Sequence, residues 1–231
     1  MSSDWQPRLL PRIRVALIDV DEPGARALDD PVLISPEEAA RARRFRGESL
    51  ERRYRRAHAA LRLLLARETG CSPAQVPISQ RDGGKPFLQG SPVSFNLSHS
   101  GHLVAVALSA GLEVGVDVEA QRRLHGDAVS LAARFCHAEE CGALTALPER
   151  GREAAFLRIW TARESLVKAL GTGLDQIPGD FNAAPLLEGA QAVEWGGWTV
   201  RVMPAPEGAF AAVAAPGAGW GYELVSPFWL D

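Results

Sequence analysis

The sequence predicts an α+β protein of two similar lobes, each formed by helices packed on a small antiparallel sheet and related by an approximate twofold axis. Segments with the period of strands and segments with the period of helices occur in both halves, and the last part of the chain is strand-like. The 231 residues are enough for two small lobes that share a core. We expect an N-terminal lobe at residues 1–115 and a C-terminal lobe at residues 116–231.

The first half begins with a predicted strand at 12–19, where apolar and polar residues alternate. Ser35 and Pro36, followed by two glutamates, are typical of a helix start, and this helix should run to about Phe45. A longer helix follows and ends at Gly70. Its predicted apolar face consists of Leu50, Tyr54, Ala57, Leu61, Leu64 and Leu65.

Strands are then predicted at 93–97, 103–108 and 113–119, with a polar loop at 98–101 between the first two. Helices return from about Asp127 to Leu170, where Gly171 supplies the stop. Their shared apolar face consists of Phe156, Ile159, Trp160, Val167 and Leu170. From Phe181 onward the segments WTVRVM and AFAAVAA predict strands separated by Gly/Pro turns.

Composition excludes several classes of protein. A net charge of -3 gives no general attraction to nucleic acid or to anionic membranes. The three cysteines form no CxxC pair, so we expect neither a disulfide framework nor a zinc site. The uncharged stretch 208–222 is too short to span a bilayer, and the N-terminus lacks the pattern of a secretion signal. We therefore expect a cytoplasmic protein, and a monomer.

Two carboxylates in the segment GVDVE suggest a metal site. Asp117 and Glu119 are two apart, so on a strand both point to the same face. Paired carboxylates repel each other unless a cation lies between them, and Mg²⁺ prefers such oxygen ligands. An ordinary strand with a solvent-exposed polar face is the alternative.

A helical segment, WTARESLVKAL, brings Glu164 and Lys168 to one helix face, because they are four apart. A surface salt bridge is the alternative reading. The chain has 25 Lys+Arg, of which only Lys85 and Lys168 are lysines. Lysine is a compact point charge whose pKa can shift enough to move protons, so its retention at these two places suggests a role.

Two further segments suggest phosphate binding. The glycines before Lys85 let backbone N–H groups approach an anion, and His99 lies in a polar segment nearby in the sequence. A plain turn and a loop histidine are the alternatives. Between Arg41 and Arg67 there are ten arginines against two glutamates, which indicates a solvated face, a phosphate-binding face or a surface for an acidic partner.

Taken in order, these segments resemble the motif set of the larger 4'-phosphopantetheinyl transferases, the surfactin-synthetase-activating type. The motifs are GKP at 84–86, FNLSHSG at 95–101, GVDVE at 115–119 and WTARESLVKALGTGL at 160–174. The segment SPEEAARARRFR resembles the N-terminal helix of that family, so the resemblance runs from about Ile34 to Leu174.

The resemblance implies an Mg²⁺-dependent enzyme that transfers 4'-phosphopantetheine from coenzyme A to a serine of an acyl, peptidyl or polyketide carrier protein and releases 3',5'-ADP. It implies that coenzyme A binds in the cleft between the lobes and that Asp117, Glu119 and Glu164 hold the ion. As catalytic residues we expect Glu164 to take the serine proton, directly or through a water held by the ion, and Lys168 to stabilise phosphate. The resemblance assigns further coenzyme A contacts to Lys85, Ser98, His99, Arg41 and Arg53.

The sequence departs from the family pattern at two positions. Arg163 stands where the family usually has lysine, so a planar fork replaces a point donor. Glu38 stands where some members carry a phosphate-binding lysine, and a carboxylate cannot make that contact. Nearby arginines must compensate, or the site is weaker there.

Three alternatives of other classes remain. A nucleic-acid-binding protein would use the arginine run and would not need Asp117. A carrier-binding protein without catalysis would lack a carboxylate or the lysine, and the sequence has them all. Another Mg²⁺-dependent phosphate enzyme would normally show a phosphate fingerprint such as GxxxxGK[ST], which the sequence lacks.

Overall fold

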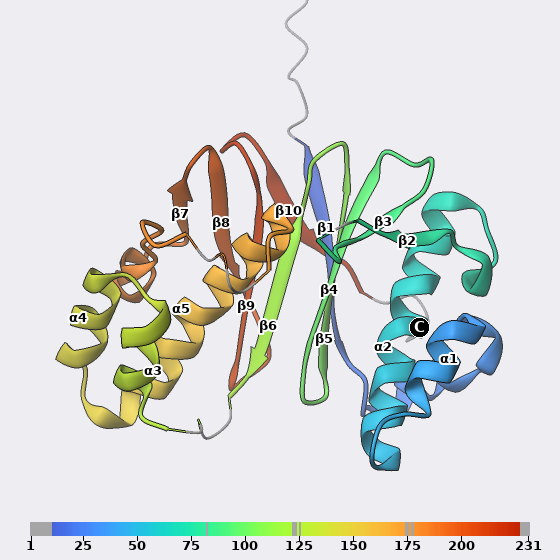
Figure 1. Cartoon of the computed structure of the whole chain (residues 1–231), viewed down its shortest axis with the longest axis horizontal. Coiled ribbons are helices and arrows are strands. Elements are labelled where there is room, and N and C mark those ends of the chain that lie inside the picture. Colours follow the sequence, from blue (N-terminus) through green and yellow to red (C-terminus); the bar gives the residue numbers. More distant parts are fainter. Residues whose placement is uncertain are drawn as a thin grey trace, which may run out of the picture.

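The computed structural model describes residues 11–81, 83–121, 124, 126–173, 176 and 178–226. It has four layers: helices, a four-stranded sheet, a second four-stranded sheet, and helices again (Figure 1). The mixed fold with small, largely antiparallel sheets confirms the predicted α+β class. Leu174, the last residue of the predicted 160–174 motif, lies outside the described residues.

The first sheet has the strand order β10-β1-β5-β4. It is formed by β10 (Gly221–Leu224), β1 (Arg12–Asp19), β5 (Leu103–Ala110) and β4 (Val93–Ser100). Helix α2 (Glu48–Thr69) packs on its outer face, and α1 (Pro36–Ala42) lies against α2 (Figure 1). The apolar side of α2 that includes Leu61 and Leu65 shares a core with Val104 and Val106 of β5.

The second sheet has the order β6-β9-β8-β7. It is formed by β6 (Gly115–Ala120), β9 (Ala209–Pro216), β8 (Trp198–Met203) and β7 (Ala192–Trp195). Helix α5 (Glu149–Leu170) packs on its outer face, flanked by α3 (Ala128–Phe135) and α4 (Ala138–Ala146) (Figure 1). Each lobe thus has one long helix lying on one sheet.

A third core fills the space between the two sheets. Strand alternation places Ala105 and Ala107 of β5 on this side, opposite to their neighbours that face α2. Val116 and Val118 of β6 join them from the other lobe. The lobes therefore share an apolar interior, and the relative position of β4, β5 and β6 is fixed by packing.

The predicted helix ends are explained by local contacts. Ser35 caps α1 through a reciprocal capping box with Glu38, each side chain bonding the other residue's backbone N–H. Gly70 ends α2 and Gly171 ends α5, both with a positive φ that favours glycine. The helix predicted to reach Phe45 ends earlier, at Ala42.

Two predictions about single segments are wrong. Ser98 to Ser100 belong to strand β4 and not to a polar loop, because they pair with β5 down to Leu103. Leu50 is 51% exposed and does not join the core under α2, since it lies in the first turn, beyond the sheet's apolar surface. The other predicted core residues of α2 are buried.

The division of the chain at residue 115 stays a prediction, and one strand crosses it. Strand β10, near the C-terminus, pairs in parallel with β1 and so completes the first sheet. The remaining short elements lie outside both large sheets; they are β2 (Ile78–Gln80), β3 (Pro86–Leu88) and 3-10 helices at Pro23–Asp29, Pro31–Leu33, Pro73–Gln75 and Ala184–Glu188. Within the described ranges, no helix has the length and apolar character needed to cross a membrane.

Candidate active site

Strand β6 and helix α5 approach each other closely because position 115 is glycine. A Cβ atom at Gly115 would collide with the carbonyl oxygen of Ser165 and with the backbone of Ala169. This close contact places the carboxylates of β6 against the face of α5 that includes Glu164 and Lys168. The sequence motif therefore needs its first glycine for packing.

Asp117 is the centre of a polar cluster at the boundary between the lobes. Its Oδ1 atom accepts hydrogen bonds from Lys168 Nζ at 2.5 Å and from Ser98 Oγ at 2.7 Å. Lys168 Nζ also donates to Ser98 Oγ, at 2.9 Å. Three residues that are far apart in the sequence, each of them a predicted site residue, thus meet on β6, α5 and β4.

Negative charge accumulates in this cluster. Burial, followed by the charge of Asp117, raises the pKa of Glu164 to about 7, with a smaller contribution from Glu119. Burial raises the pKa of Asp117 to about 6, although the Lys168 ammonium and the Ser98 hydroxyl act in the opposite direction. Asp117 and Glu119 therefore both lie close enough to Glu164 to disfavour its ionisation.

The donor set suits a hard cation. The Oδ2 atom of Asp117 is buried and has no hydrogen-bond partner, and Glu164 meets like charge from Asp117. Carboxylate oxygens with uncompensated charge are the ligands that Mg²⁺ prefers. No three His, Cys, Asp or Glu side chains among the described residues are arranged to hold an ion as they stand, and the Lys168 ammonium lies against Asp117.

Three of the predicted coenzyme A contacts line neighbouring pockets of the N-terminal lobe. A pocket of about 140 Å³ is lined by Arg53, His99, Tyr54 and apolar side chains. A larger one of about 470 Å³ is lined by Arg41 and shares Tyr54 with the first. His99 is exposed to solvent, but desolvation of its ring by the surrounding protein, followed by the charge of Lys168, lowers its pKa. His99 therefore lies at the first pocket and within electrostatic reach of Lys168.

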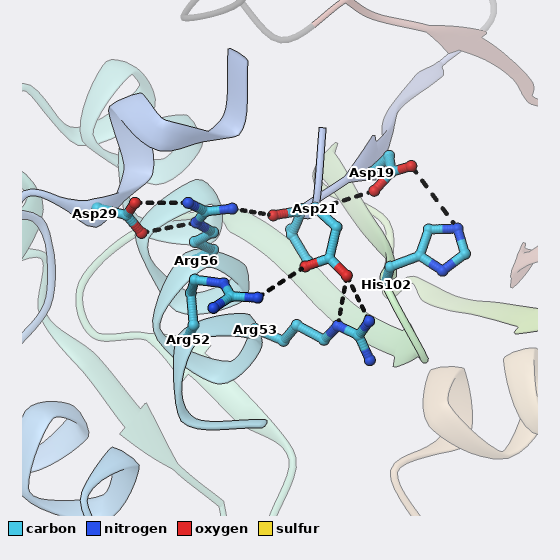
Figure 2. Close-up of polar contacts among 8 residues, drawn as sticks. Asp19, Asp21, Asp29, Arg52, Arg53, Arg56 and His102 are labelled. Atoms are coloured by element: carbon cyan, nitrogen blue, oxygen red, sulfur yellow. Dashed lines mark hydrogen bonds and ion pairs between the residues drawn. The ribbon is translucent and has the colours of Figure 1, made fainter. Parts of the chain in front are cut away.

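Arg53 is held in place by an acidic neighbour. Its guanidinium donates from Nε and Nη2 to the carboxylate of Asp21, as Figure 2 shows. One turn further along α2, Arg56 makes a two-pronged contact with Asp29, at 2.7 and 2.6 Å, and donates to the carbonyl of Val20 (Figure 2). The arginine-rich segment is therefore only partly a solvated face, since Arg56 is buried in a structural ion pair.

Lys85 lies in a different environment from the one that the resemblance suggests. Its buried ammonium donates to Glu113 Oε2 and to the carbonyl of Ala169, both at 2.8 Å. Gly83, two residues earlier, lies against the carbonyl of Gly171, where a Cβ would approach to 2.6 Å. In this structure Lys85 ties the N-terminal lobe to the end of α5, and its contact with coenzyme A stays a prediction.

Both departures from the family pattern have structural roles. Arg163 points away from the carboxylate cluster and is fully buried, with Nε donating to Glu140 at 2.9 Å and Nη2 to the carbonyl of Phe181 at 2.7 Å. Arg163 therefore joins α5 to α4.

Glu38, the second departure, accepts from Arg62 at 2.5 Å and pairs with His58 at 3.0 Å. Burial would raise the pKa of Glu38, but the hydrogen bonds from His58, Arg62 and the Ser35 N–H outweigh it and lower that pKa to about 2.

One residue of the cluster escaped the sequence-based prediction. Ser100 donates from Oγ to Glu119 Oε2 at 2.6 Å. The signal was present, because Asn96, Ser98 and Ser100 alternate with the period of a strand. Treating 98–101 as a loop concealed the fact that these three side chains share a face.

The cluster and the pockets lie in a chain whose relatives are known. A sequence profile described as the 4'-phosphopantetheinyl transferase superfamily matches residues 113–201, which include Asp117 and Glu164. The chain is 31% identical over 226 residues to the 4'-phosphopantetheinyl transferase HetI of Nostoc sp., with 94% of this chain and 95% of the relative covered. The chain belongs to the 4'-phosphopantetheinyl transferase superfamily.

Other relatives of this phosphopantetheinyl transferase agree. A putative 4'-phosphopantetheinyl transferase of Synechocystis sp. is 35% identical over 188 residues, covering 76% of this chain and 73% of the relative. The 4'-phosphopantetheinyl transferase Sfp of Bacillus subtilis is 26% identical over 162 residues, covering 70% of each. These matches confirm the resemblance to the larger, surfactin-synthetase-activating type.

Proposed function

We propose that this transferase moves the 4'-phosphopantetheine group from coenzyme A to a serine of an apo acyl, peptidyl or polyketide carrier protein and releases 3',5'-ADP. The observation that supports this most is the meeting of Asp117, Lys168 and Ser98 at the boundary between the lobes, beside Glu164. Carboxylates and one lysine in a partly buried cluster suit the handling of a diphosphate. We also propose that the protein is a cytoplasmic monomer.

Coenzyme A would lie along the N-terminal lobe with its diphosphate at the cluster. Arg41 and Arg53 line the two pockets that share Tyr54, and we assign them to the 3'-phosphate end. His99 lines the first pocket and lies next to Ser98 in β4, so it would contact phosphate between the two regions. Lys85 would contact phosphate only after leaving Glu113, which makes it the least supported of these assignments.

Asp117, Glu119 and Glu164 would hold Mg²⁺. The ion would supply charge compensation for the diphosphate and for the leaving 3',5'-ADP, because three carboxylates alone repel such an anion. The buried Oδ2 atom of Asp117, which has no hydrogen-bond partner, supports this assignment.

In the chemical step the carrier serine oxygen attacks the β-phosphorus, the one that bears pantetheine. A new bond forms between that oxygen and phosphorus, and the bond from phosphorus to the bridging oxygen breaks, so 3',5'-ADP leaves with the electron pair. Glu164 would accept the serine proton, since it lies on the α5 face that meets β6. Lys168 would stabilise charge on the phosphate oxygens, and the enzyme would act mainly by alignment.

Mass spectrometry of carrier proteins tests this function. The protein is incubated with coenzyme A, Mg²⁺ and a panel of apo carriers, and each carrier is examined for the gain of one phosphopantetheine group. We expect that gain on at least one carrier, with 3',5'-ADP formed in equal amount. The Asp117→Ala variant is the control. Absence of any gain with every carrier class, from a folded protein, would contradict the proposal.

A further inference from the structure

The edge strands of the two large sheets lie next to each other without forming a common sheet. Strand β4 ends the first sheet and β6 ends the second, and their residues are in contact. Strand β4 pairs with β5, and strand β6 pairs with β9. The hydrogen bonds between β4 and β6 therefore involve side chains, and each of them uses a side chain of β4.

Three alternating residues of β4 point toward β6. Asn96 Oδ1 accepts the backbone N–H of Val116 at 2.9 Å. Ser98 Oγ donates to Asp117 at 2.7 Å, and Ser100 Oγ donates to Glu119 Oε2 at 2.6 Å. We call these three residues of β4 the β4 ladder. Successive residues of the β4 ladder contact Val116, Asp117 and Glu119 of β6, so the ladder fixes the register between the two strands.

The Ser100 contact has the properties of a strong hydrogen bond. Its length of 2.6 Å lies in the range for a hydroxyl donating to an ionised carboxylate. Ser100 is buried, with 7% of its surface exposed, so water competes little for its hydroxyl. A buried donor on one oxygen limits the rotation of the Glu119 carboxylate. It therefore sets the direction in which Glu119 presents its charge to Asp117 and Glu164.

We infer that Ser100 is a positioning residue, which holds Glu119 from the opposite lobe in the orientation that cation binding requires. The inference rests on the proposed function, because it concerns the metal role of Glu119. Ser100 itself would touch neither substrate nor ion. Partners that orient metal-binding side chains typically change metal affinity by roughly 10- to 100-fold when removed.

Calorimetry measures this without turnover. Mg²⁺ is titrated into the protein with coenzyme A present and no carrier. For Ser100→Ala we expect Mg²⁺ binding about tenfold weaker than for the wild type. In transfer assays the same variant should need about tenfold more Mg²⁺, while the KM for coenzyme A and the rate at saturating Mg²⁺ change little. Ser100→Thr, which keeps the hydroxyl, should restore most of the affinity.

Ser109→Ala is the matched control. Ser109 is also a buried serine, on the neighbouring strand β5, but its hydroxyl has no hydrogen-bond partner. Its removal should leave Mg²⁺ binding at the wild-type value. Equal Mg²⁺ affinity in Ser100→Ala and the wild type, or equal losses in Ser100→Ala and Ser109→Ala, would overturn the inference.

A second measurement separates this inference from the proposed function. Urea unfolding without Mg²⁺ is compared for Ser100→Ala, for Glu119→Ala, which removes the acceptor oxygens, and for the double variant. We expect the two substitutions to be non-additive, because each removes the same bond. Additive effects would show that Ser100 does not hold Glu119. If wild-type protein binds no Mg²⁺ while the unfolding cycle shows coupling, the metal assignment fails and the Ser100 contact stands.

Discussion

Helices α2 and α5 occupy equivalent places in the two lobes. Each runs for 22 residues, packs on the outer face of a four-stranded sheet and ends at a glycine with positive φ. They differ in the charges that they bury. Arg56 and Arg62 of α2 lie against Asp29 and Glu38, so each buried charge has an opposite charge beside it.

On α5, a buried charge with an opposite partner and a buried charge that meets like charge occur at adjacent residues. Arg163 pairs with Glu140 in a fully buried contact, as on α2. Glu164, the next residue, is buried and meets like charge from Asp117, and these two effects raise its pKa to about 7. Compensated buried charges belong to the architecture, and we take the buried charge that meets like charge as the mark of the proposed site. Substitutions on the two helices should therefore separate loss of stability from loss of transfer.

The largest effect is expected at the carboxylate cluster of Asp117, Glu119 and Glu164. Asp117→Asn keeps the size of the side chain but removes the charge on which Lys168 and the ion depend, so transfer should fall about 1,000-fold. Unfolding in urea should show no loss of stability, because burial without full compensation already disfavours the carboxylate. Steady-state transfer assays over a Mg²⁺ series measure the first quantity. Near-normal transfer at any Mg²⁺ concentration would contradict the proposed role of Asp117.

The next effect concerns stability. Arg163→Met should lower the free energy of unfolding by about 3 kcal/mol or more, because Glu140 would be left buried without a cation. Urea or thermal unfolding followed by circular dichroism measures it. Arg163→Lys, which keeps the charge but loses the fork, should recover part of that loss. A wild-type unfolding midpoint for Arg163→Met would contradict the structural role of this pair.

Arg53 and Arg56 of α2 form a matched pair for a smaller effect. Arg53→Ala should raise the KM for coenzyme A about tenfold and leave stability nearly unchanged, since its ion pair with Asp21 is partly exposed. Arg56→Ala should leave that KM unchanged and lower stability by about 2 kcal/mol, because its guanidinium is buried (Figure 2). Coenzyme A kinetics and urea unfolding of both variants decide. The reverse pattern would show that Arg53 does not contact coenzyme A.

The smallest effect is expected at Glu38. Because its pKa is lowered to about 2 in the folded protein, it contributes stability that is fully present above about pH 4.5 and is lost as pH falls toward 2. Glu38→Gln should cost about 1 kcal/mol at neutral pH. The difference between variant and wild type should shrink on acidification, which urea unfolding at several pH values measures. A difference that grows on acidification would contradict the conclusion that ionised Glu38 stabilises the folded protein.

Much of the fold follows from local pattern. Strand β1, the stops at Gly70 and Gly171 and the segments of β8 and β9 were predictable, because alternation and glycine are local signals. Strand β10 was not predicted as a partner of β1, since that pairing joins the two ends of the chain. The extension of β4 through Ser100 was also missed, because polar residues on an edge strand look like a loop in sequence.

The site was predictable in part for the same reason. The ordered motifs pointed to Asp117, Lys168 and Ser98, and the structure brings these three together. The sequence did not distinguish Lys168, which contacts Asp117, from Lys85, which contacts Glu113 and the end of α5. Both lysines stand in short motifs, and they differ only in tertiary contacts. Nor could it show that Arg163 turns away from Glu164, since that depends on the packing of α4.

A crystal structure with coenzyme A and Mg²⁺ tests the central claim most directly. We expect electron density for an ion bound at about 2.1 Å by oxygens of Asp117, Glu119 and Glu164, and by oxygens of the diphosphate. The Lys168 ammonium should then contact phosphate. A diphosphate bound elsewhere, with Lys168 still on Asp117 and no ion at the three carboxylates, would contradict the claim that this cluster is the catalytic centre.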